Sequence, residues 1–169
     1  MSAPLSAESA WRRSRIAALV AQPAAGADWS LAIPSGHVYR LLAVMATLVT
    51  SAAVATRIPR LVVSDGNTRL IDVPPFATQA ASLTRRYLYL PQCSAFATGN
   101  GVLSPLPDIS LQAAWTIGTL TDAIDAADQW SSIVLHVIDT TVRAGAVDLD
   151  GLPDLIVEIV EAGPGSSVV

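Results

Sequence analysis

Lysine is absent from this 169-residue sequence, and charged residues of all kinds make up only 14% of it. The ten basic residues are all arginines and are outnumbered by fourteen acidic residues, which gives a net charge of −4. Proteins that bind nucleic acids usually show the opposite balance, because basic side chains must face the phosphates. Soluble domains usually carry about 25% charged residues, so this chain has little polar surface with which to cover an isolated monomer. We expect no nucleic-acid partner, and we expect contacts with other subunits.

Cysteine and histidine are scarce as well. The single cysteine, Cys93, cannot form an intramolecular disulfide, and its isolation excludes cysteine-rich zinc sites and iron–sulfur clusters. The two histidines, His37 and His136, form no His-x-His pair, and the sequence has no phosphate-binding loop, dinucleotide fingerprint or Gly-x-Ser-x-Gly elbow. We therefore expect no enzyme activity and no cofactor. His136 lies in an apolar run, and we interpret it as a core or interface histidine.

A long uninterrupted apolar run is also missing. The run at residues 41–55 falls short of the roughly 20 residues that a membrane-spanning helix needs, and Thr47, Thr50 and Ser51 interrupt it. Its β-branched residues fit a buried strand better. We expect no membrane partner.

What the chain does contain is a high apolar content, 51% of its residues, which excludes disorder over most of its length. Short β-type runs are separated by turn residues at the spacing of a β-sandwich, and no βαβ alternation occurs. Asp65-Gly66-Asn67 is a hairpin signal, whereas residues 92–108 are rich in loop-forming residues. The sequence predicts an all-β fold, an antiparallel two-sheet jelly-roll-like sandwich of about eight or nine strands. The runs lie at residues 37–50, 58–64, 69–73, 81–90, 109–111, 115–121 and 131–140.

The sequence pattern divides the chain into three parts. Residues 1–27 are predicted to form an N-terminal α-helical arm, in which Trp11, Ile16 and Leu19 recur at roughly helical spacing. Residues 28–143 are predicted to form the sandwich, and residues 144–169 are predicted to form a C-terminal arm or tail with an apolar run at residues 155–160. One short amphipathic helix is not stable alone, so the arm must dock on its own domain or on another subunit.

Two of the predicted strands are apolar on both faces. In a free-standing sandwich a strand should alternate between apolar and polar residues, but residues 41–49 and 133–138 are apolar or small on both sides. Either an outer layer such as the arm or a neighbouring subunit must cover the second face. The low charge favours the subunit.

Three aspartates at a regular spacing, Asp122, Asp125 and Asp128, form a candidate calcium site. Calcium prefers carboxylate oxygens, but this spacing does not match an EF-hand loop. The alternative is a short turn in which the aspartates cap backbone amides.

Two groups of aromatic residues are candidate binding surfaces. Alternation places Arg85 and Tyr87 on one sheet face. An arginine beside aromatic residues can form a nucleic-acid-binding surface, but in an acidic chain ion pairs between subunits are the better interpretation. The tryptophans lie in apolar contexts typical of core anchors, although a sugar-stacking shelf is the alternative for Trp29, Trp115 and Trp130.

The order of these features is similar to that of a known group of proteins. The segment Trp29-Ser-Leu-Ala-Ile-Pro-Ser-Gly36 opens a long strand, Arg57 and the Asp65-Gly66 hairpin follow, and Asp128-Gln-Trp-Ser-Ser-Ile-Val-Leu135 comes last. Residues 28–140 resemble small β-sandwich virion structural proteins of tailed bacteriophages, of the auxiliary capsid (decoration or cement) type. The resemblance implies a non-enzymatic homotrimer that binds the major capsid protein or other virion proteins, in a virion assembled in the bacterial host cytoplasm.

The predicted contacts lie in the arm, on a sheet face and in the tail; they are Trp11, Arg12, Ile16, Leu19, Arg85, Tyr87, Leu155 and Ile156. The alternative is a tail-associated or surface glycan-binding module that uses Trp115, Trp130 and the loop from Asp122 to Asp128.

Overall fold

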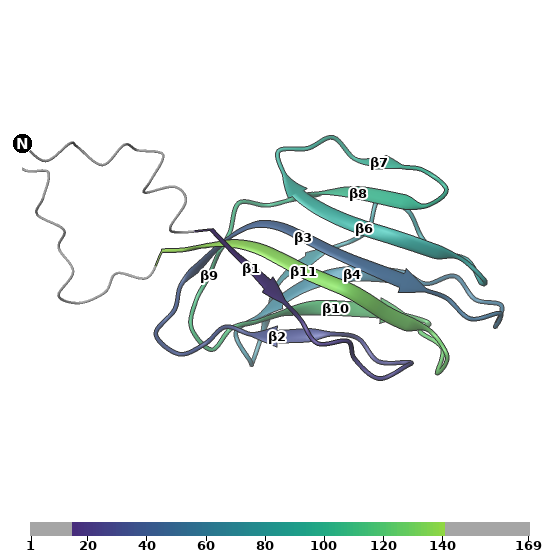
Figure 1. Cartoon of the computed structure of the whole chain (residues 1–169), viewed down its shortest axis with the longest axis horizontal. Coiled ribbons are helices and arrows are strands. Elements are labelled where there is room, and N and C mark those ends of the chain that lie inside the picture. Colours follow the sequence, from purple (N-terminus) through teal and green to yellow (C-terminus); the bar gives the residue numbers. More distant parts are fainter. Residues whose placement is uncertain (1–14, 141–169) are drawn as a thin grey trace, which may run out of the picture. The chain divides into compact units, whose positions relative to one another are not determined.

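The computed structural model describes residues 15–140, which contain strands and turns and no helix. Eleven strands form two sheets (Figure 1). The all-β, two-sheet prediction is confirmed. No helix in this part of the chain could cross a bilayer.

The larger sheet has the strand order β1-β11-β3-β6-β8-β7, and β9 pairs with the first residues of β3. Its strands are β1 (Arg15–Leu19), β3 (Tyr39–Val49), β6 (Thr84–Pro91), β7 (Phe96–Ala97), β8 (Gly101–Leu106), β9 (Ser110–Leu111) and β11 (Gln129–Asp139). The smaller sheet has the order β2-β10-β4-β5. Its strands are β2 (Ser30–Ala32), β4 (Ile58–Ser64), β5 (Arg69–Val73) and β10 (Thr116–Asp122).

The β4–β5 hairpin forms where the sequence predicts it, for a local reason. The Oδ1 atom of Asp65 accepts hydrogen bonds from the amides of Asn67 and Thr68, at 2.8 and 2.7 Å. Gly66 has a φ of +98°, which a residue with a Cβ rarely adopts.

The predicted helical arm is wrong where the structure describes it. Residues 15–19 form the strand β1, which pairs with β11 from Arg15↔Ile138 to Leu19↔Val134. A short helix gains little without tertiary packing, whereas a strand here satisfies its backbone on the edge of a sheet. Trp11 and Arg12 of the predicted arm lie outside the described residues, as do Leu155 and Ile156 of the predicted tail.

The sequence predicts antiparallel pairing throughout, and the larger sheet departs from this prediction. β6 and β8 are parallel, and the chain between them contributes β7, which pairs with β8. This region was expected to be mainly loop because of its glycines and prolines. β7 pairs only with Val102 and Leu103, so β8 is an edge strand at Pro105, the kind of position where a residue without a backbone N–H is found.

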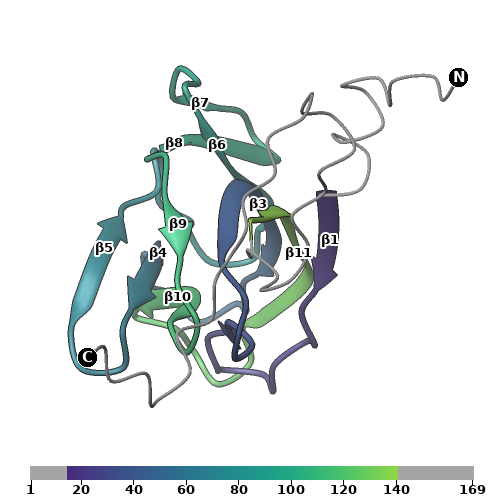
Figure 2. The same ribbon diagram turned by 90° about the vertical axis from the view of Figure 1, so that its left-hand side faces the viewer.

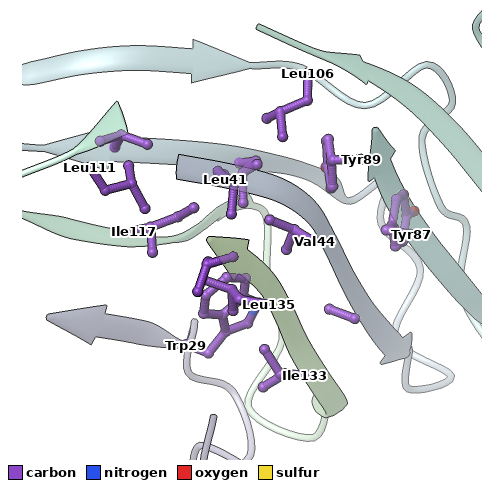
Figure 3. Close-up of a cluster of buried hydrophobic side chains, with 14 of the residues drawn as sticks. Trp29, Leu41, Val44, Tyr87, Tyr89, Leu106, Leu111, Ile117, Ile133 and Leu135 are labelled. Carbon is purple, nitrogen blue, oxygen red and sulfur yellow. The ribbon is translucent and has the colours of Figure 1, made fainter. Parts of the chain in front are cut away.

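One hydrophobic core includes buried residues of both sheets. Leu41, Val44 and Leu135 of the larger sheet belong to the same cluster as Leu61 and Ile117 of the smaller one. Trp29, Tyr87 and Tyr89 are among the large side chains in it (Figure 3). The two sheets thus form a sandwich-like pair of layers, which Figure 2 shows from the end.

Candidate functional site

A fully buried ion pair joins the two sheets. Arg57 directly precedes β4 and Asp128 directly precedes β11, and neither side chain is exposed. The guanidinium is bidentate, with Nε–Oδ2 and Nη2–Oδ1 distances of 2.8 and 3.1 Å. Its remaining N–H groups donate to Ser51 Oγ and to the carbonyls of Ala53 and Ala55. All five donors of the guanidinium are therefore used.

Both oxygens of the Asp128 carboxylate also accept hydrogen bonds. Besides the two bonds from Arg57, it accepts hydrogen bonds from the amides of Ser51 and Asp125, each at 2.8 Å. Burial by itself raises the pKa of Asp128, but the hydrogen bonds from Arg57 and these amides outweigh it and hold the pKa below its usual value. The charge of Asp128 is thus compensated within the chain.

The three aspartates of the candidate calcium site have different partners. Asp128 binds Arg57, Asp122 binds Arg60 at 3.1 Å, and Asp125 accepts a hydrogen bond from Ser51 Oγ at 3.0 Å. Within residues 15–140 no three side chains of the metal-ligating types gather around one point. The arrangement fits the alternative reading, in which the aspartates organise a turn.

Tyr87 lies in the core, and this corrects its assignment to a subunit contact. Its side chain is fully buried, 5.9 Å from the ring of Trp130, and its hydroxyl donates to Gln79 Oε1 at 3.1 Å. Gln79 in turn donates to the carbonyls of Leu48 and Leu83. Burial raises the pKa of Tyr87 to about 12, against a smaller lowering effect of Arg85.

Arg85 binds loops of its own chain. It donates to the carbonyls of Gly99 and Thr78, and its side chain stays partly exposed. The contacts hold the loop before β6 and the turn before β8 against each other.

Trp130, expected in a glycan shelf under the alternative function, is 1% exposed and donates its indole N–H to Asp28. Trp29 is also in the core, and Trp115 is half-buried against it. A sugar cannot stack on the buried rings of Trp29 and Trp130, so the three tryptophans do not form a common exposed shelf.

The two histidines have different surroundings. His37 Nδ1 lies 2.8 Å from Asp139 Oδ2, with 43% of the histidine side chain exposed. His136 is exposed on the outward face of β11, so it is not a core histidine; the interface interpretation stays a prediction. Neither residue lines the groove described below.

The outward face of the larger sheet carries a continuous row of apolar side chains. Leu19 pairs with Val134, Val134 with Met45, Met45 with Leu88, Leu88 with Leu103, and Leu103 with Phe96. These six residues, the apolar row, come from six strands and cross the sheet from β1 to β7. Each is partly or largely exposed, with Leu19 80% and Phe96 58% exposed. On the central strands, buried core residues flank Val134, Met45 and Leu88. The apolar character of residues 41–49 and 133–138 on both faces was the sequence signal for this row.

A groove of about 670 Å³ opens at one end of the apolar row. Leu88, Phe96 and Leu103 supply apolar lining. The polar lining comes from Thr47, Thr84, Arg86, Thr98 and Asn100. Sequence reasoning missed this groove because β7 and β8 were expected to be loop.

Comparisons with protein-family models, curated proteins and solved structures find no match to this chain.

Proposed function

We propose that the chain is a non-enzymatic structural protein of a tailed-bacteriophage virion, a jelly-roll capsid decoration or cement protein that self-associates as a trimer and stabilises the head lattice. The proposal combines the resemblance of residues 28–140 with one structural observation, the apolar row. In this proposal the major capsid protein is the partner, and the virion is the place of action.

The apolar row supports self-association because a stable domain rarely leaves a connected apolar stripe on its surface. Burying apolar area contributes roughly 25 cal/mol per Å² before the entropic costs of association. The low charge of the chain leaves few ionic groups to oppose such contacts.

The buried polar contacts support a scaffold role. Arg57 and Asp128 tie the starts of β4 and β11, and Asp28 binds Thr121 of β10 and Trp130 of β11. These bonds fix the two sheets against each other. A fixed sandwich presents the same outward face in every copy, as a lattice requires.

The test is the oligomeric state of the full chain, by light scattering after size-exclusion chromatography, together with binding to capsids that lack decoration. The apolar-row variant Leu19→Asp is expected to weaken self-association at least tenfold, since it places a charge in a buried contact. Val54→Asp is the matched control, because Val54 is 98% exposed and outside the row. A monomer that does not bind capsids, or equal behaviour of the two variants, would overturn the proposal.

A further inference from the structure

Arg86 is a charged group without a counter-charge in the described part of the chain. Its side chain is exposed in the groove, and it makes no side-chain hydrogen bond or ion pair with any residue among 15–140. By contrast, Arg40, Arg57, Arg60 and Arg69 each bind an aspartate. The groove therefore has one open position that favours a carboxylate.

The rest of the groove favours an extended peptide. Leu88 and Leu103 are cross-strand neighbours in the apolar row, whereas Thr47 and Arg86 are neighbours in the next row toward the start of β6. One side of the groove is thus apolar and the other polar and cationic. A strand with an apolar face and carboxylates beside it has the complementary pattern.

The chain contains such a segment outside the described residues. Residues 154–160 read Asp-Leu-Ile-Val-Glu-Ile-Val, so in an extended conformation Leu155, Val157 and Ile159 share one face. Asp154 and Glu158 share the other face, and no basic residue follows Arg143. This segment, called the tail segment below, matches the groove in both apolar pattern and charge.

The chain leaves the sandwich at a distance from the groove, so binding within one chain would have to extend the connecting residues. The amide of Thr140 donates to the carbonyl of Val38, beside the start of β3, whereas Thr47 of the groove lies near the end of β3. Eight residues along β3 and two strands across the sheet make a path of about 30 Å. Residues 141–153 have a root-mean-square span of about 20 Å, so binding in the same chain needs a stretched connection.

We propose that the groove beside Arg86 binds the tail segment, residues 154–160, of a neighbouring copy of the chain. Leu155, Val157 and Ile159 cover the apolar end of the groove, and an acidic residue of the segment pairs with Arg86. This inference rests on the proposed self-association and names the segment and the surface that produce it.

Cross-linking between two differently marked full-length copies tests the proposal. One copy carries Leu103→Cys and the other Val157→Cys, both with Cys93→Ser, and a short bismaleimide joins cysteines that lie close together. The expected product is a mixed dimer. The control replaces Leu103→Cys by Val54→Cys, whose side chain is 98% exposed and outside the groove. A yield no greater than that of the control overturns the proposal.

Charge reversal gives a second readout. Arg86→Glu is expected to lower the cross-linked yield about three- to tenfold, because it places a carboxylate opposite an acidic segment. Reversing Asp154 and Glu158 to arginine in the other copy is expected to restore the yield. A yield that does not respond to either change overturns the role of Arg86.

The outcomes separate this inference from the proposed function. If the chain forms a trimer and binds capsids but gives no specific cross-link, the tail-segment inference fails and the proposed function stands. If both cysteines in one chain give only an intrachain product in a monomer, the segment binds its own groove. That result overturns both proposals.

Discussion

Arg57 and Asp128, which are 71 residues apart in the sequence, form a bidentate ion pair in which neither side chain is exposed. Such a pair contributes little net stability compared with apolar residues of the same shape, but removal of one partner leaves a buried charge without compensation. The pair therefore fixes the start of β4 relative to the start of β11 more than it adds to the overall stability.

Asp128→Asn is expected to lower the free energy of unfolding by about 3–5 kcal/mol, because it leaves the Arg57 guanidinium buried and unpaired. Urea unfolding followed by circular dichroism measures the loss. Asp122→Asn is the matched control, since the pair of Asp122 with Arg60 is partly exposed and its loss should cost less than about 1 kcal/mol. Equal losses in the two variants would contradict the role given to the buried pair.

The stability of the protein is expected to fall in acid through Asp128. The pKa of Asp128 is lowered in the folded state, so its contribution is complete above the unfolded-state pKa of about 3.9 and is lost as the pH falls through the lower folded-state value. Unfolding free energies measured from about pH 6 downward should therefore decline more steeply for the wild type than for Asp128→Asn. Parallel curves would argue against this linkage.

Alkaline conditions are expected to destabilise the fold through its buried tyrosines. The pKa of Tyr87 is raised to about 12 by burial, and burial raises that of Tyr89 further. Because an unfolded tyrosine ionises near pH 10, the unfolded state releases its protons first and stability falls from about pH 10 to pH 12. Phenolate absorbance gives the ionisation in the native state, and unfolding curves give the loss of stability. Tyr87→Phe should make the decline less steep, at a cost of about 1 kcal/mol near neutral pH for the lost bond to Gln79.

Gly118 in β10 is expected to tolerate no side chain. A Cβ at this position would lie 2.3 Å from the carbonyl oxygen of Trp29 and 3.0 Å from the Cα of Ser30, and both are backbone atoms. Gly118→Ala should therefore separate β2 from β10 and lower the melting temperature by several degrees or more, a loss of more than about 1 kcal/mol. Gly99→Ala, where a Cβ meets nothing within 4 Å, should leave the melting temperature nearly unchanged.

Local chemistry in the sequence was sufficient for part of the fold. The alternating residues of β4 and the turn at Asp65-Gly66-Asn67 predict the hairpin, because side-chain alternation and positive φ are properties of neighbouring residues. Residues 41–49 and 133–138 are apolar on both faces of their strands, which also predicts that the outward face of the sheet must be covered.

The features that depend on distant partners could be decided only by the tertiary structure. Residues 15–19 have a pattern compatible with a helix, and the edge of β11 makes them a strand. The spacing of three aspartates does not reveal that Asp128 forms a buried ion pair with Arg57. Likewise, a composition typical of loops does not reveal that residues 101–106 form a strand that pairs in parallel with β6. The apolar row exists only because six strands from distant parts of the chain align in register. Composition and periodicity fix what each residue favours locally, but pairing depends on loop closure and burial across the whole chain, which no local pattern contains.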